Sequence, residues 1–91
     1  MAKAKIPTSM QEACEILCAQ LSVEDIDLIK SGQITPTDMH FSLGLWIRNS
    51  WIYKGKLQPS QLGLDDTLGL FPDSISDEIL TNLVSFIKEN K

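Results

Sequence analysis

Apolar and polar residues follow the period of an α-helix along most of the chain. Apolar side chains stand three and four positions apart in four stretches, and no stretch shows the strict alternation of a β-strand. The four stretches are residues 10–20, 23–31, 35–53 and about 73–88. The pattern therefore predicts an all-α fold, a compact bundle of about four helices.

Start and stop signals set the bounds of these helices. Ser9 and Ser22 stand directly before the first two stretches, where a hydroxyl can accept a hydrogen bond from the amide three residues on. Thr35 followed by Pro36 opens the third stretch, since proline suits the first helical position. Gly32 ends the second stretch, because glycine readily adopts the left-handed conformation found after helices.

Two segments fall outside the helical pattern. Residues 57–72 contain two glycines and Pro59, so we expect a loop there with one turn of helix. Residues 1–8 are polar and precede the first start signal. We therefore expect a flexible N-terminal tail over residues 1–8 and a single helical domain over residues 9–91.

The stretch 40–51, HFSLGLWIRNSW, holds the only histidine, the only arginine and both tryptophans of the chain. On a helical wheel, one of its faces consists of His40, Gly44, Ile47 and Trp51. Apolar residues cover most of the remaining circumference, and a helix that is apolar all round is buried all round. We therefore expect residues 35–53 to form the central helix, around which the others pack. Gly44 suggests the close approach of another backbone.

The same stretch holds the candidate binding residues. His40 could serve as a general base, and the planar fork of Arg48 could bind a phosphate or a carboxylate. Asn49 could bond to a loop backbone. Trp51 and Tyr53 could line a cleft beside them.

A purely structural role is the alternative for the polar members of this set. A single histidine near a helix start, among apolar neighbours, is more often a hydrogen-bonded structural residue than a ligand. A mostly buried Arg48 needs an acidic partner. The candidates for that partner are Asp38, Asp65 and Asp66.

The two cysteines indicate no metal site and no cofactor. Cys14 and Cys18 stand four residues apart, on one face of a helix. A structural zinc site takes four ligands, and the chain offers one histidine besides these thiols. We interpret both cysteines as small, mostly buried apolar residues.

Charge and hydropathy exclude several classes of protein. The net charge is −4, and the acidic residues are spread along the chain, which argues against nucleic-acid binding. No apolar run reaches the ~20 residues of a membrane-spanning helix. No apolar segment of a secretory signal follows the N-terminal lysines, so we expect a cytoplasmic protein. No catalytic motif is present, which favours a domain that is not an enzyme.

The central run resembles a small bacterial domain family of unknown function. The run reads His-Phe-x-x-Gly-x-Trp-Ile-Arg-Asn, from His40 to Asn49. The resemblance implies no activity. It implies that the motif residues act together, for folding or for function; they are His40, Gly44, Trp46, Arg48 and Asn49.

These observations favour a small cytosolic protein–protein interaction module. Its partner would be another protein, or a second copy in a homodimer formed through the wide apolar stripe of the last helix. The alternative is a small enzyme or ligand-binding domain that uses His40 and Arg48 in a cleft.

Overall fold

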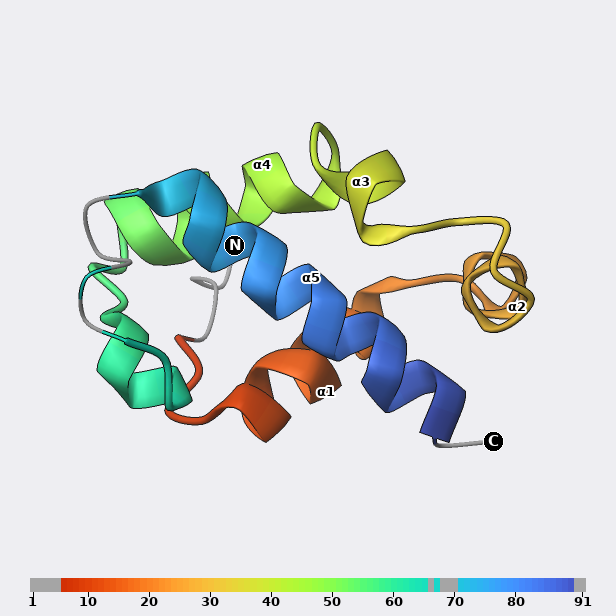
Figure 1. Ribbon diagram of the computed structural model, residues 1–91, viewed down its shortest axis with the longest axis horizontal. Coiled ribbons are helices and arrows are strands. Elements are labelled where there is room, and N and C mark those ends of the chain that lie inside the picture. The colour runs from red at the N-terminus through yellow and green to blue at the C-terminus, as the bar shows by residue number, and fades with distance from the viewer. Residues whose placement is uncertain (1–5, 66, 68–70, 90–91) are drawn as a thin grey trace.

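The computed structural model describes residues 6–65, 67 and 71–89, and all regular structure in these residues is helical (Figure 1). The all-α prediction is therefore confirmed, with five α-helices where about four were expected. The α-helices are α1 (Met10–Gln20), α2 (Val23–Lys30), α3 (Pro36–Met39), α4 (Leu43–Ile47) and α5 (Pro72–Glu89). A π-helix, η1 (Arg48–Tyr53), continues α4, and a short 3-10 helix, η2 (Pro59–Leu62), precedes α5.

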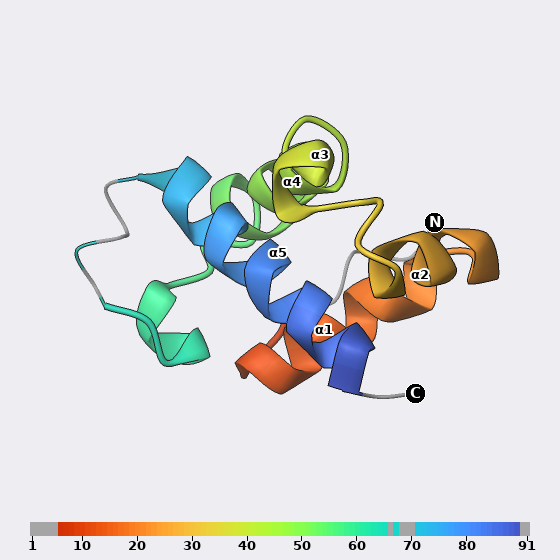
Figure 2. The same ribbon diagram turned by 45° about the vertical axis from the view of Figure 1, so that its right-hand side comes forward.

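The long helix α5 occupies the centre of the domain. It crosses the middle of the molecule and packs against α1, α2, α3, α4 and η1 (Figures 1 and 2). Two adjacent stripes of α5 point into the core, which is why one helix can contact so many neighbours. The buried residues of these stripes are Ile75, Ser76, Ile79, Leu80, Leu83 and Ile87. The apolar stripe that suggested a homodimer is thus covered within the domain.

The stretch 35–53 is not the single central helix that its composition predicted. It is divided into α3, α4 and η1, with a turn between α3 and α4 in which Ser42 has φ −106° and ψ −85°. An unbroken helix would use the carbonyl of His40 to accept from the amide four residues on. In the structure that carbonyl accepts from Nη2 of Arg48 at 3.2 Å. The side chain of Arg48 therefore satisfies a backbone group that the turn leaves without its helical partner.

The expectation that this stretch is buried on all sides is also wrong. Gly44 and Ile47 are buried, as the helical wheel indicated, and both face the core. Phe41 and Leu45, however, remain 83% and 46% exposed. The segment therefore has apolar side chains both in the core and at the surface.

The start signals of the first three helices are confirmed. Ser9 Oγ accepts from the amide of Glu12, and Ser22 Oγ accepts from the amide of Asp25, both at 3.1 Å. Thr35 forms a complete capping box at the start of α3. These bonds satisfy amides that lack a partner within their own helix.

Residues 6–8, which the sequence placed in the tail, pack against the domain. Pro7 is buried, and Ile6 contacts the core. The amide of Thr8 donates to Oε1 of Glu12 at 2.9 Å. A Cβ added to Gly55 would collide with the side chain of Ile6, so glycine at position 55 is what lets this segment lie so close.

The connection from η1 to α5 contains a helical turn, as expected. That turn is η2, and it ends at Gly63, whose φ of +76° is in the left-handed region. Leu57 and Leu62 anchor the connection in the core. Residues 66 and 68–70 of the predicted loop lie outside the described residues.

Candidate functional site

His40 lies in the turn after α3 and pairs with a carboxylate from α5. Its Nδ1 is 3.0 Å from Oδ1 of Asp77. Its ring also meets the ring of Phe41 edge-on, with centroids 4.8 Å apart and planes at 88°. The sequence contained no carboxylate at ligand spacing on the same helix, and the partner comes from a residue 37 positions away.

A small hollow surrounds this pair. It measures about 220 Å³ and is lined by Pro36, Thr37, His40, Asp77 and Thr81. A carboxylate bound to Nδ1 orients an imidazole and leaves Nε2 as the nitrogen that can exchange a proton, as in many catalytic pairs. Thr37 and Thr81 line the same hollow, so most of its lining residues are polar.

Arg48 is buried and joins α5 to the turn between α3 and α4. Nη1 donates to Oγ of Ser76 at 2.9 Å, and Nη2 donates to the carbonyl of His40 at 3.2 Å. Nε lies 3.3 Å from Oδ1 of Asp73, so the ion pair extends to the first turn of α5. Each of the three guanidinium nitrogens has a partner within the domain. The geometry therefore supports a structural role for Arg48 rather than the binding of a phosphate or a carboxylate ligand.

Among the described residues, the acidic partner of Arg48 is neither Asp38 nor Asp65. Asp38 and Asp65 each accept a hydrogen bond from the backbone amide of a nearby threonine. Asp66 lies outside the described residues. Asp73 takes the role instead, because the packing of α5 against α4 brings the start of α5 beside the guanidinium.

Trp51 and Tyr53 do not line a common cleft. Trp51 is fully buried, and it packs edge-on against Trp46 with centroids 5.3 Å apart. Its Nε1 is buried, with no hydrogen-bond partner among the described residues. Tyr53 is 58% exposed. Trp51 is therefore a core residue, and Tyr53 belongs to the surface.

Three residues of the central motif form one cluster. The carbonyl of His40 accepts from Arg48, and a Cβ added to Gly44 would lie 3.3 Å from Nη1 of Arg48. The same Cβ would lie 3.4 Å from Cδ1 of Leu80 on α5. The carbonyl oxygen of Met39 would also lie 3.4 Å from that Cβ, so Gly44 leaves room for two side chains and for the backbone of Met39. Asn49 is exposed and takes no part in this cluster.

The turn before α4, together with α4 and η1, carries exposed side chains that the sequence did not single out. We call them the outer ridge, and they are Phe41 in the turn, Leu45 on α4, and Asn49 and Tyr53 on η1. These residues stand four positions apart in the sequence, while Gly44, Ile47, Arg48 and Trp51 between them are buried. Apolar residues stand on both the exposed and the buried side, so the pattern could not separate the two.

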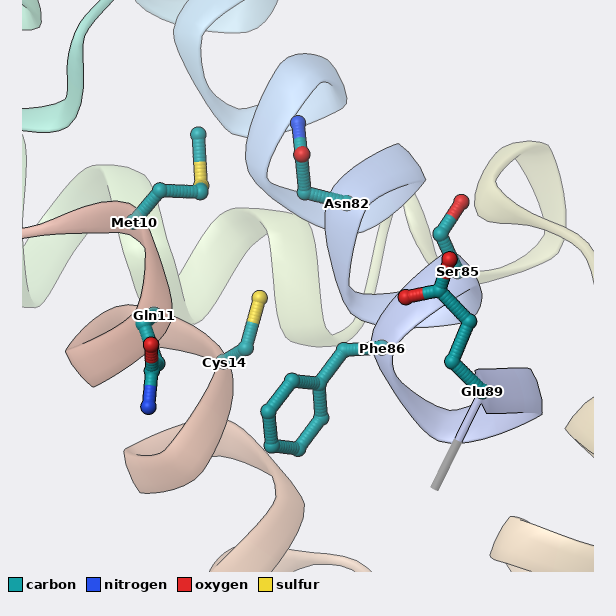
Figure 3. A pocket seen from close by; sticks show the side chains of 7 residues that line it. All are labelled: Met10, Gln11, Cys14, Asn82, Ser85, Phe86 and Glu89. Carbon is teal, nitrogen blue, oxygen red and sulfur yellow. The ribbon is translucent and has the colours of Figure 1, made fainter. Parts of the chain in front are cut away.

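A second hollow lies between α1 and α5 (Figure 3). It measures about 380 Å³ and is lined by Met10, Gln11, Cys14, Asn82, Ser85, Phe86 and Glu89. Figure 3 shows the Sγ atom of Cys14 directed into the space between the two helices. Burial raises the pKa of the Cys14 thiol to about 11, with smaller contributions from Cys18 and Glu15. The thiol is therefore protonated at neutral pH and is a poor nucleophile.

Within the described part of the chain, His, Cys, Asp and Glu side chains nowhere gather in threes or more as metal ligands would. The described helices also include none with the length and apolar character needed to cross a membrane.

A model of one protein family, described as "Domain of unknown function (DUF6794)", matches residues 6–86. The chain belongs to this family. The match begins at Ile6, where the described structure begins, and it ends within α5. Neither a curated protein nor a solved structure matches the chain. Membership of this family implies no activity for the chain.

Proposed function

We propose that this domain is a small cytosolic protein–protein interaction module of bacterial origin, and that the outer ridge is its recognition surface. The observation that carries the proposal is the exposure of three large apolar side chains in one row. Phe41, Leu45 and Tyr53 are 83%, 46% and 58% exposed. The two free cysteines of the domain suit a reducing compartment.

The composition of the outer ridge is that of an interface. The centres of protein interfaces are poor in charge and rich in aromatic residues, and tyrosine often contributes much of the binding energy. From Phe41 to Tyr53 the only charged residue is Arg48, which is buried. The exposed row carries no charge, although the chain has a net charge of −4.

The ends of the ridge define the chemistry of the partner. Lys54 and Lys56 are exposed directly after Tyr53. A partner that covers the ridge needs an apolar stripe of its own. At one end of that stripe it needs carboxylates that face the two lysines. An acidic amphipathic helix has these properties.

The outer ridge suits a protein better than a small molecule, because neither hollow described above includes a ridge residue. The two hollows of about 220 and 380 Å³ are lined by other residues. A ridge offers a small ligand few contacts, whereas a protein can cover it along its whole length.

Site-specific photo-crosslinking tests the proposal. A photoreactive phenylalanine analogue replaces Phe41 in one variant and Val23 in another, and both are expressed in the native host. Val23 is the matched control, because it is 75% exposed but lies on α2, at the far end of α5 (Figure 1).

We expect the probe at position 41, but not at position 23, to crosslink one protein, through an apolar segment of that protein. The crosslink should disappear in Leu45→Glu and weaken in Lys54→Glu. Equal labelling from both positions, or a crosslink that survives Leu45→Glu, would contradict the proposal.

A second candidate function is acid–base chemistry at the pair of His40 and Asp77. The observation that favours it is the 3.0 Å contact between them, beside the hydroxyls of Thr37 and Thr81 in one hollow. NMR of the single imidazole, during titration with small carboxylates and phosphates, tests this candidate. Shifts that saturate and that vanish in Asp77→Asn support it. An imidazole that responds to pH alone contradicts it.

A further inference from the structure

We propose that the partner of the outer ridge is a second copy of this chain, packed antiparallel about a twofold axis. This inference rests on the proposed function and names its partner. A self-complementary surface is what a symmetric dimer requires, because each copy presents the same patch to the other.

The two ends of the ridge carry opposite charges. At the end near Phe41, Asp38 is exposed, and Asp77 is 54% exposed. Asp77 is held there by His40, whose ring packs against Phe41. At the other end stand Lys54 and Lys56, which are also exposed. An antiparallel arrangement brings each acidic end against a basic end, whereas a parallel arrangement brings like charges together.

The order of residues along the ridge agrees with this arrangement. Two antiparallel copies place the Phe41 end of each copy against the Tyr53 end of the other. Phe41 then meets Tyr53, and the acidic residues beside Phe41 face Lys54 and Lys56. Aromatic side chains in such pairs contribute both buried area and favourable ring geometry.

The size of the surface sets the strength of the dimer. A stable specific interface buries about 800 Å² on each partner. A row of four side chains covers less than that. The dimer should therefore be weak and concentration-dependent, and its charge pairs should make it weaker at high salt.

Sedimentation velocity on the full chain, from about 1 µM to about 1 mM, measures the association. We expect monomers at the lowest concentration and a growing dimer fraction above it. Leu45→Glu should remain monomeric throughout, while the matched control Val23→Glu should behave as the unaltered chain does. A chain that stays monomeric at 1 mM, or a dimer that persists in Leu45→Glu, would overturn the proposal.

A charge exchange between two variants tests the antiparallel arrangement itself. Asp38→Lys alone places lysine opposite lysine, and Lys56→Glu alone places acid opposite acid, so each variant should associate at least tenfold more weakly than the unaltered chain. Mixing the two variants restores an opposite-charge pair at both ends. The mixture should therefore form heterodimers to a greater extent than either variant dimerises alone.

Because Asp38→Lys also removes a helix cap, its fold is first verified by circular dichroism and by thermal unfolding. A mixture of Asp38→Lys with the unaltered chain serves as the control, in which only one of the two charge pairs is restored. Absence of rescue in the exchanged mixture overturns the antiparallel dimer. The photo-crosslinking experiment separates this failure from that of the proposed function, because a crosslink from position 41 to a different protein would still support the ridge as an interface.

Discussion

The guanidinium of Arg48 donates to the hydroxyl of Ser76 across 2.9 Å, and both side chains are buried. Ser76 Oγ in turn donates to the carbonyl of Asp73, also at 2.9 Å. The side chain of Arg48 thus connects to the first turn of α5 through a hydroxyl that is itself held in place. We therefore expect the only arginine of the chain to stabilise the fold.

We expect Ser76→Ala to lower the free energy of unfolding by about 1–3 kcal/mol, because it leaves a buried charged donor without its acceptor. Arg48→Met should cost about 2–4 kcal/mol, since Ser76 and the carbonyl of His40 lose their donor together. Urea denaturation measures both. Asp73→Asn is the control: its side chain is 71% exposed, and solvent screening should keep its cost below about 1 kcal/mol. A Ser76→Ala variant as stable as the unaltered chain would contradict this role.

Gly55→Ala should loosen the N-terminal segment. The added Cβ would collide with Ile6 and would lie 2.7 Å from the carbonyl oxygen of Trp51. Since the backbone oxygen cannot move freely, we expect a loss of about 1–3 kcal/mol. Limited proteolysis near residue 6 should also become faster. Gly44→Ala is the graded comparison: its Cβ would lie 3.3 Å from Nη1 of Arg48, so a small shift of that side chain relieves the contact and the loss should be smaller. Equal effects of the two substitutions would contradict the account.

The start signals were predictable from the sequence because they are local. Ser9, Ser22 and Thr35 each act on a residue three positions away, and all three caps form as expected. The partners of His40 and Arg48 were not predictable, because they lie 37 and 28 positions away and depend on how α5 packs.

The break after α3 was missed for the same reason. The carbonyl of His40 has a partner outside the helix only because Arg48 can reach it. Once the segment is broken, Phe41 and Leu45 emerge at the surface. Composition indicated how apolar the segment is, but it could not tell which of its apolar residues the other helices leave uncovered. For that reason the outer ridge could not be predicted from the sequence.

The capping box of α3 should make stability depend on pH. The backbone amide of Thr35 donates to Asp38 at 2.8 Å, and this bond lowers the pKa of the Asp38 carboxyl from its ordinary 3.8. The pKa of Asp38 is lower in the folded chain than in the unfolded chain. The ionised carboxylate therefore stabilises the fold above pH 3.8, and this stabilisation is lost as the pH falls through the pKa of the folded chain.

We therefore expect Asp38→Asn to be less stable than the unaltered chain at pH 7. The difference should close as the pH falls below 3.8. Thermal unfolding of both proteins across a series of pH values measures it. A difference in stability that stays constant down to pH 2 would show that the charge of the Asp38 carboxylate is not its cause.

The two cysteines should differ in reactivity. Cys14 is 2% exposed, and burial raises the pKa of its thiol to about 11, whereas Cys18 is only partly buried. At pH 8, a thiol reagent should modify Cys18 first and Cys14 only after unfolding. Cys18→Ala should therefore show almost no fast-reacting thiol, and Cys14→Ala should show one. Equal rates at both positions would show that the groove between α1 and α5 is more open than the structure indicates.

The same thiol should weaken the fold at alkaline pH. The unfolded chain ionises Cys14 near its ordinary pKa of 9.0, and the folded chain does so only near 11. Stability should therefore fall as the pH rises through this interval, because the unfolded state releases the proton more readily. The fall should be smaller in Cys14→Ala when both proteins are compared by urea denaturation at pH 8 and pH 10.5.

The central claim is that Phe41, Leu45 and Tyr53 are exposed in order to bind a protein and contribute little to folding. The most direct measurement is urea denaturation of the triple variant Phe41→Ser, Leu45→Ser and Tyr53→Ser, in parallel with photo-crosslinking from position 49. The account predicts a free energy of unfolding within about 0.5 kcal/mol per substitution of the unaltered chain, together with loss of the crosslink. A loss of several kcal/mol, or a crosslink that remains, would contradict it.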